Sequence, residues 1–242
     1  MLKVPAVSSR MSPPAPSETD YPAEMFRRDL PAELRVGCGW AYFRSNFVAR
    51  WLFRRRLEVA FQQIPQRRFE RALDLGTGVG YVLPALANLA EEVVGADLSP
   101  VIRYAATMLD KRGLRNVRLI MADLSKLPFS SETFDLVVCL SVIEHIPDLQ
   151  AAFAEMRRAL RKGGSLLIGY PMEHAVFRFL EDLLRLQTRR QRGRPTGDAF
   201  RPHVSTFHEI EKSWHQLFEV NARQDIRLMG LPIYRVLRLE PV

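Results

Sequence analysis

The chain has 242 residues, of which 47% are hydrophobic and 26% charged, and its formal net charge is +8. This composition excludes collagen-like, low-complexity and transmembrane proteins, and it suits one globular domain with a helical extension. The basic excess is compatible with a nucleic acid or an anionic membrane as partner, but arginine-rich surface helices give the same excess, and we favour this second interpretation.

Cysteine content and the N-terminal sequence bear on the compartment. The two cysteines, Cys38 and Cys139, form no C-x-x-C pair, so neither a disulfide framework nor a zinc site is indicated. Prolines interrupt the start before an apolar signal segment can form, and no run approaches the roughly 18 apolar residues of a membrane span. We therefore expect a cytoplasmic protein.

The N-terminal part divides into two segments. Residues 1–20 are rich in proline and serine and are predicted to be disordered, and residues 21–70 are predicted to form a helical cap. Within the cap, residues 41–64 show apolar side chains at helical spacing opposite several arginines. This amphipathic basic helix would either close over an acceptor pocket or make peripheral contact with a membrane.

The central stretch of the chain runs from Leu73 to Tyr81, where an apolar run breaks into Gly76, Gly78 and Gly80. This pattern predicts a buried strand, a tight turn and then a helix whose free N–H groups face the turn. A dinucleotide fingerprint would need its third glycine where Tyr81 stands, and the Gly-Lys-Ser/Thr ending of a P-loop is absent. The stretch still predicts a site for a nucleotide-type ligand.

Three further predicted strands also end in polar residues. Residues 93–97 end in Asp97, about 20 residues after the first glycine, which is the spacing of a carboxylate that binds ribose hydroxyls. The strands at 117–122 and 134–140 are followed by Asp123 and Ser141. Because parallel strands share one carboxyl edge, we expect these groups to lie together.

The order of predicted elements gives the fold class. Strands at 71–75, 93–97, 117–122, 134–140 and 165–170 alternate with helices at 79–90, from Pro100 with Ser99 as N-cap, and at 149–160. This alternation predicts an α/β fold with a parallel sheet. Residues 172–187 are predicted to be helical and 188–202 to be a polar loop, so that 172–205 forms a lid inserted after the fifth strand.

The C-terminal part begins with a capping box. Thr206 and Glu209 predict a helix from Phe207 to about Phe218, and residues 225–229 and 233–240 predict an antiparallel hairpin. The loop also contains Arg-Gly-Arg-Pro at 192–195, the core of arms that bind the DNA minor groove, although flanking basic residues are sparse.

These residues together resemble one known family. The glycine loop, Asp97, Asp123, the segment 134–147 and the segment 160–168 occur in the order typical of class I S-adenosylmethionine-dependent methyltransferases of the type 11 sort. The resemblance covers residues 71–170. It implies a methyltransferase domain at 71–242 with a Rossmann-like, seven-stranded, mostly parallel sheet and helices on both faces.

The resemblance also implies the residues that bind the cofactor, S-adenosylmethionine. The loop would hold the methionine end through Gly76, Thr77, Gly78 and Gly80, supported by Asp74. Asp97 would bind the ribose, Leu98 would lie against the adenine, and Asp123 would accept from the adenine amino group beside the Leu124 backbone. Ser141 is assigned to the same cofactor site.

The chemistry requires few catalytic residues, because the methyl group on a sulfonium is already activated and the protein mainly aligns the reacting atoms. A base is needed only for an acceptor such as a hydroxyl that must lose a proton. His145, His174 and His203 follow or precede elements that end near the acceptor pocket. We name His145, Glu144 and His203 as candidate catalytic residues, with Glu144 orienting His145.

No metal site is expected, because Ser141 stands where a known metal-binding motif has a carboxylate. The segment from Ser141 to His145 resembles the Glu-x-x-Glu-His motif with which quinone-biosynthesis O-methyltransferases and small-RNA 2′-O-methyltransferases hold a divalent ion. Here Ser141 replaces the first carboxylate, and magnesium prefers charged oxygen ligands. Glu144 and His145 alone would be a poor magnesium site, so we predict metal-independent turnover.

The sequence therefore predicts methyl transfer from S-adenosylmethionine to a small, apolar or aromatic metabolite, with the acceptor atom undecided among oxygen, carbon and nitrogen. The alternative is a macromolecule methyltransferase, or a basic nucleic-acid-binding module on the same fold. No RNA-binding module is recognisable in the sequence, so a nucleic acid is not the expected partner.

Overall fold

The computed structural model describes residues 16–21, 47–172 and 203–242. Its centre is a seven-stranded sheet of order β3-β2-β1-β4-β5-β7-β6. In chain order the strands are β1 (Phe69–Leu75), β2 (Ala90–Asp97), β3 (Val117–Met121), β4 (Phe134–Leu140), β5 (Leu160–Pro171), β6 (Phe218–Leu228) and β7 (Leu231–Pro241). The strands from β1 to β5 are parallel, and β7 is antiparallel to both β5 and β6. The predicted Rossmann-like sheet is confirmed.

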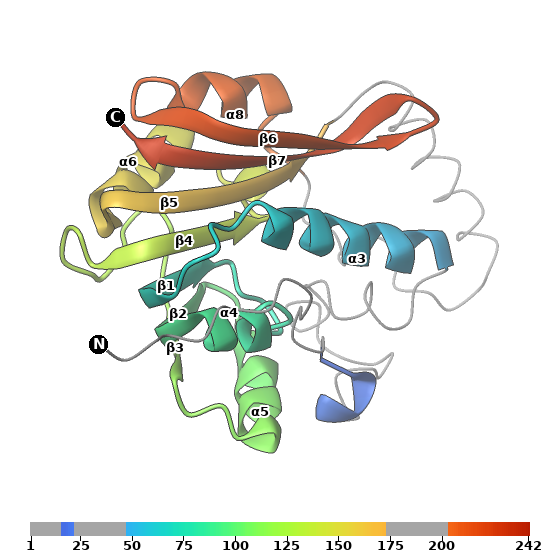
Figure 1. Ribbon diagram of the computed structural model, residues 1–242, viewed down its shortest axis with the longest axis vertical. Helices are drawn as coiled ribbons and strands as arrows, with labels where there is room; N and C mark the ends of the chain where they lie inside the picture. Colours follow the sequence, from blue (N-terminus) through green and yellow to red (C-terminus); the bar gives the residue numbers. More distant parts are fainter. Residues whose placement is uncertain (1–15, 22–46, 173–202) are drawn as a thin grey trace, which may run out of the picture.

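Helices cover both faces of the sheet (Figure 1). On one face lie α3 (Phe47–Gln62), α4 (Leu83–Leu89) and α5 (Ile102–Arg112), which share a core cluster with the sheet. On the other face lie α6 (Leu149–Ala159) and α8 (Phe207–Trp214), packed in a second cluster. Two short 3-10 helices, η1 (Glu18–Asp20) and η3 (Ile143–His145), complete the described elements.

The sheet positions a site at one edge. The strand order reverses between β1 and β4, which are neighbours although β2 and β3 lie between them in the chain. Crossover connections leave these two strands in opposite directions, and in α/β sheets ligands bind beyond the carboxyl ends of the strands at such a point. The loops after Leu75, Asp97, Met121 and Leu140 all lie at this edge.

The N-terminus departs from its prediction at residues 16–21. Residues 18–20 form η1 instead of remaining disordered, and Tyr21 is buried. An ion pair joins Asp20 to Arg112 on α5 at 2.8 Å, and Lys111 donates to the carbonyls of Thr19 and Tyr21. This long-range pairing with α5 explains why local composition alone was misleading.

Two helices begin later than predicted. The helix α4 starts at Leu83 instead of Val79, because Gly80 has φ +78°, outside the helical range. The helix α5 starts at Ile102 and its N-cap is Val101, so Ser99 is not the N-cap. The Val101 N–H donates to the Ser99 hydroxyl oxygen at 3.4 Å. Both helices begin only after an extra turn.

The C-terminal elements also differ in length. The capping box of Thr206 and Glu209 is present, so that prediction is confirmed, but α8 ends at Trp214. Strand β6 then begins at Phe218, well before the predicted residue 225. Its exposed side chains are mostly polar because it is an edge strand, and this pattern hid its first half. The hairpin with β7 is correspondingly longer.

Part of the predicted cap and lid lies outside the described residues. Of the lid at 172–205 the structure describes Met172 and residues 203–205, and of the cap it describes α3 and the segment that follows. Within the described ranges, none of the helices has the length and apolar character to cross a bilayer.

Candidate active site

The glycine loop forms a tight cradle after β1. Gly76, Gly78 and Gly80 all have positive φ, which glycine adopts without strain. The N–H groups of Gly76 and Thr77 donate to the Ala96 carbonyl at 2.8 and 3.1 Å, which joins the loop to β2. A Cβ at Gly76 would lie 2.2 Å from Val142 Cγ2, so the chain passes here in close contact with the segment after β4.

Asp74 supports the loop from below, as predicted from the family resemblance. Its side chain is only 4% exposed, and the Thr77 hydroxyl donates to Asp74 Oδ2 at 2.6 Å. The pKa of Asp74 is raised to about 7, chiefly by burial; the Thr77 bond lowers it and the nearby Asp97 carboxylate raises it. The carboxyl therefore exchanges its proton near neutral pH.

Asp97 lies at the end of β2 and faces the loop. Its Oδ2 accepts from the Gly78 N–H and its Oδ1 from the Ser99 N–H, both at 2.7 Å. A carboxylate has about four lone-pair directions, so two bonds leave two free for hydroxyl donors. This arrangement orients Asp97 and keeps it able to bind a ribose.

Two apolar side chains stand exposed beside Asp97. Leu98 is 54% exposed and Met121 is 62% exposed, and Met121 is the register partner of Asp97 on β3. Asp123 is also exposed, with Oδ1 accepting from the Ser125 N–H at 2.8 Å, whereas the Leu124 side chain is buried. An apolar surface next to an acceptor carboxylate is what an adenine ring and its amino group require.

Ser141, the first residue after β4, is held in a polar network. Its φ of +57° is unusual for a residue with a side chain, and its N–H donates to the Gly169 carbonyl at 2.7 Å. Its hydroxyl lies 2.7 Å from the Tyr234 hydroxyl and accepts from the Arg56 guanidinium at 2.8 Å. The described contacts of this hydroxyl thus link α3 to β7.

The three predicted catalytic side chains lie together. One ligand-capable atom of each of Glu144, His145 and His203 lies within 4.8 Å of the others, and the two imidazole rings are 5.2 Å apart between centroids. Glu144 is 3% exposed, and the Glu144 carbonyl accepts from the N–H groups of Val204 and Ser205. The structure thus joins η3 to the segment before α8.

The remaining histidines divide into two groups. His208 and His215 lie at α8, where both are exposed and their rings lie against Phe207 and Trp214. His174 lies outside the described residues. The catalytic candidates of this region are therefore His145 and His203.

Sequence reasoning missed three residues of this edge. Arg56 is one of the arginines that the helical pattern of residues 41–64 places opposite the apolar side chains. In the structure it is 8% exposed, and its guanidinium lies 3.9 Å from the centroid of the Phe53 ring. Tyr234 and Met121 were not singled out. The position of Met121 near the end of the predicted strand at 117–122 could have indicated its place beside Asp97. No sequence pattern marks Arg56 or Tyr234 as part of this edge.

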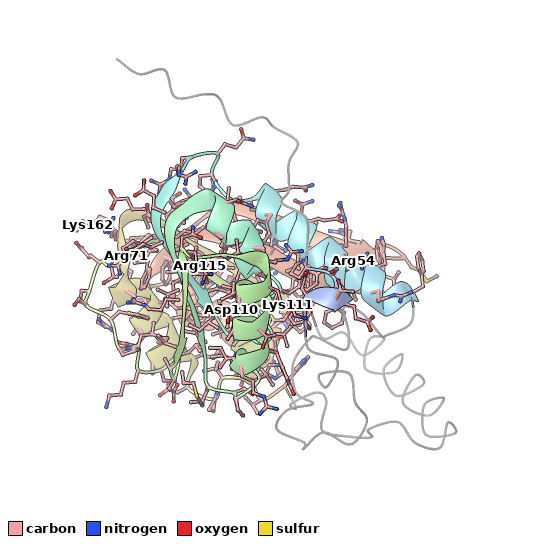
Figure 2. All side chains as sticks on the ribbon, turned by 90° about the horizontal axis from the view of Figure 1, so that it is seen from below. Arg54, Arg71, Asp110, Lys111, Arg115 and Lys162 are labelled. Carbon is pink, nitrogen blue, oxygen red and sulfur yellow. The ribbon has the colours of Figure 1, made fainter. Side chains whose placement is uncertain are left out.

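Several arginines of the described residues form ion pairs. Arg71 pairs with Glu92 at 3.0 Å, Arg158 with Glu155 at 2.7 Å, and Arg161 with Glu70. The charged side chains labelled in Figure 2 come from α3, β1, β5, and α5 with the segment that follows it, and the acid Asp110 is among them.

Comparison with known proteins agrees with this geometry. A family model described as a methyltransferase domain matches residues 73–168. The chain is 29% identical over 173 residues to the uncharacterized methyltransferase YcgJ of Bacillus subtilis, covering 69% of this chain and 63% of that protein. It is 36% identical over 122 residues to a demethylmenaquinone methyltransferase of Thermus thermophilus, covering 49% and 53%. The chain thus spans about half to two thirds of the length of these relatives.

A solved structure shares the whole fold. The PH0226 protein of Pyrococcus horikoshii superposes with a TM-score of 0.66 at 23% identity, covering 88% of this chain and all of that one. The matched family region begins in β1 and ends in β5, so it contains the glycine loop, Asp97, Asp123 and Ser141. Residues 73–168 therefore carry a methyltransferase domain of the class I S-adenosylmethionine-dependent type, whose methyl donor is S-adenosylmethionine.

Proposed function

We propose that the protein transfers the methyl group of S-adenosylmethionine to a small, apolar or aromatic metabolite. The observation that carries this proposal is the loop of three positive-φ glycines with the Asp97 carboxylate bonded to the Gly78 N–H at 2.7 Å. At Gly78 a Cβ would meet only the Gly76 carbonyl oxygen, at 4.0 Å, so the backbone there is open to a ligand, and Asp97 keeps lone pairs for two hydroxyls. These features fit the methionine and ribose parts of the donor.

The rest of the donor fits the same edge. Leu98 and Met121 offer apolar surface to the adenine, and Asp123 offers an acceptor to its amino group. Ser141 remains in the proposed cofactor site, where its polar network with Arg56 and Tyr234 forms the wall beyond the loop. The chemistry is then an in-line transfer in which the acceptor lone pair forms the new bond to carbon and the C–S electron pair returns to sulfur.

The acceptor side is proposed at Glu144, His145 and His203. Val142 lies against the loop at Gly76, and Glu144 and His145 follow it in the same segment. The residues after His203, Val204 and Ser205, donate their N–H groups to the Glu144 carbonyl. Their imidazole and carboxylate groups can take or hold the proton that a hydroxyl acceptor loses. We infer that 172–205 covers the acceptor, since its described ends bond to Ile233 and Glu144 at this edge.

Two observations favour a small acceptor over a macromolecule. One matched relative is named for demethylmenaquinone, a small aromatic metabolite with an apolar tail. Several arginines of the described residues also bind carboxylates of this chain, which compete with phosphate groups for them. The proposal includes a cytoplasmic location, supported by the free, buried thiol of Cys139.

Replacing Asp97 by alanine tests the proposed donor site. The Asp97→Ala variant should bind S-adenosylhomocysteine more weakly by about 1.5–3 kcal/mol, the scale of a hydrogen bond to a charged group, as measured by calorimetry. Asp135→Ala is the matched control, because Asp135 also accepts from two backbone N–H groups, those of Glu70 and Arg71, but near the amino ends of β1 and β4. Wild-type affinity in Asp97→Ala, or equal losses in both variants, would sink the assignment.

A further inference from the structure

We propose that Glu144, His145 and His203 bind a divalent transition-metal ion, with zinc as the preferred occupant. The inference deepens the proposed function, because it assigns an ion and an oxygen acceptor to the same edge of the sheet. It rests on the position of His203, which the chain brings to the two residues of η3 from the far side of the segment 173–202.

The geometry of the three side chains suits an ion. Ligand atoms at about 2.1 Å from a tetrahedral zinc lie about 3.4 Å from one another. One potential ligand atom of each residue lies within 4.8 Å of the other two in the structure, so small rotations of the rings and the carboxyl bring them to that separation. Both histidines are partly buried, which keeps them from the full competition of water.

The backbone fixes the cluster before any ion binds. The N–H groups of Val204 and Ser205 donate to the Glu144 carbonyl at 2.9 and 3.2 Å, and the Ser205 hydroxyl donates to the Ile146 carbonyl at 2.7 Å. These bonds hold the segment that carries His203 against η3. Affinity is gained when ligands are held in place beforehand, because less conformational entropy is lost on binding.

Burial of Glu144 favours a positive charge in the cluster. A carboxylate that is 3% exposed has lost nearly all its hydration, so a cation close to it stabilises its charged form. A divalent ion between Glu144 and the two imidazoles provides that charge. It also keeps both histidines neutral, which is the form that coordinates metal.

The donor set decides which ion fits. Two imidazole nitrogens and one carboxylate suit zinc and the neighbouring transition metals, whereas magnesium prefers oxygen ligands and near-octahedral geometry. Ser141 does not complete an oxygen-rich site, because its hydroxyl is bonded to Arg56 and Tyr234. The expectation of metal-free turnover considered Glu144 and His145 alone, and the addition of His203 changes that conclusion for zinc but not for magnesium.

An ion with three protein ligands keeps a coordination position for a water or a substrate oxygen. Bound there, an acceptor hydroxyl becomes more acidic, since the ion stabilises the oxyanion. The hydroxyl proton then leaves to solvent, the oxygen lone pair forms the bond to the methyl carbon, and the C–S pair returns to sulfur. The inference therefore selects oxygen, in a phenol or hydroxyl, as the acceptor atom.

Zinc binding to the full chain tests the inference without any activity measurement. The untagged protein is stripped with a chelator, loaded with zinc and passed over a desalting column, and bound zinc is counted by mass spectrometry. Affinity is measured by competition with a zinc-sensitive dye, and cobalt is used as a spectroscopic probe of the same site. We expect one tightly bound zinc per chain, visible cobalt ligand-field absorption, and no displacement of zinc by millimolar magnesium.

Three variants locate the ion. His203→Ala and Glu144→Gln should weaken zinc binding by about 100-fold or more, since each removes one ligand. His208→Ala is the matched control, because His208 is an exposed histidine nearby on α8. Thermal unfolding of the zinc-free proteins, together with binding of S-adenosylhomocysteine, shows whether His203→Ala still folds.

The outcomes separate this inference from the proposed function. Less than stoichiometric zinc in the wild type, or equal zinc affinity in a folded His203→Ala and in His208→Ala, overturns the metal site and leaves donor binding unaffected. Tight zinc binding with no binding of S-adenosylhomocysteine upholds the metal site and removes the proposed methyl transfer. Preference for magnesium over zinc also contradicts the inference.

Discussion

At the scale of single residues, Asp74 links the stability of the protein to pH. Its carboxyl lies beneath the glycine loop, is almost fully buried and has a pKa raised to about 7 by the loss of hydration. In the unfolded chain the pKa of this carboxyl returns to its ordinary value of 3.8. Between these two values the native state holds a proton that the unfolded state has lost, so stability falls as pH rises.

Replacing Asp74 by asparagine should remove this pH dependence. The amide keeps an oxygen that can accept from Thr77 but does not ionise. We expect Asp74→Asn and the wild type to have similar unfolding free energies near pH 4, after which the wild type loses about 1.4 kcal/mol relative to the variant for each pH unit up to about 7. Above this range the difference stays constant.

Urea unfolding at several pH values measures the difference directly. The other titrating groups cancel in the comparison, because both proteins carry them; Asp20 and Glu155, whose pKa values are lowered by their hydrogen bonds and arginine partners, are examples. Parallel stability curves for the two proteins between pH 4 and 8 would show that Asp74 is ionised throughout in the native state.

Residues differ in how far the sequence could foretell their roles. Asp97 was predictable, because a carboxylate at the end of a strand faces the site whatever the rest of the chain does. Arg56 was not, because helical spacing puts an arginine on the solvated face unless a distant hydroxyl such as Ser141 holds it. The contact of His203 with Glu144 and His145 was also hidden, since it depends on tertiary hydrogen bonds at residues 204 and 205.

At the scale of elements, the turn between β1 and α4 requires glycine for two separate reasons. Gly76 has φ +71°, and a Cβ there would overlap Val142. Gly113, which ends α5, has a similar φ of +64° but no heavy atom within 4 Å of the position of a Cβ. Alanine substitutions at Gly76 and Gly113 therefore separate two contributions to the unfolding free energy: the backbone strain of a positive φ and the steric overlap of the new Cβ.

The two alanine variants should therefore differ. Gly113→Ala should lower the unfolding free energy by about 1–2 kcal/mol, the cost of a left-handed conformation for a residue with a Cβ. Gly76→Ala should lose about 1–3 kcal/mol more, because Val142 must move. Chemical denaturation gives both values, and calorimetry should show that only Gly76→Ala loses affinity for S-adenosylhomocysteine. Equal stability losses, or unimpaired binding in Gly76→Ala, would contradict the close contact.

The boundaries of elements were harder to predict than their order. The alternation of strands and helices follows from the apolar periodicity of whole elements, which does not depend on any single residue. The start of α4 depends on the φ of Gly80, and the start of β6 at Phe218 depends on pairing with β7 at the sheet edge. Neither start is encoded in local propensity. The sequence pattern therefore placed the start of α4 at residue 79 instead of 83, and the start of β6 at residue 225 instead of 218.

At the scale of the whole molecule, one edge of the sheet gathers donor and acceptor groups from distant parts of the chain. The loop after β1 and Asp97 after β2 lie on one side of the strand reversal, and the segment after β4 with His203 lies on the other. Val142 joins the two sides through its contact with Gly76. The fold therefore places the proposed donor-binding loop and the proposed acceptor residues at the same edge of the sheet.

The most direct measurement of this account is methyl transfer from isotopically labelled S-adenosylmethionine by the full chain, loaded with zinc or stripped of it. The acceptors offered are a panel of phenols and reduced quinones, a metabolite extract, RNA, DNA and protein. We predict label in a small apolar or aromatic product that is heavier by one methyl group in place of one hydrogen, together with S-adenosylhomocysteine in equal amount. Label found only in RNA, DNA or protein would contradict the small-molecule acceptor, and no transfer to any acceptor by a protein that binds the donor would contradict the assigned activity.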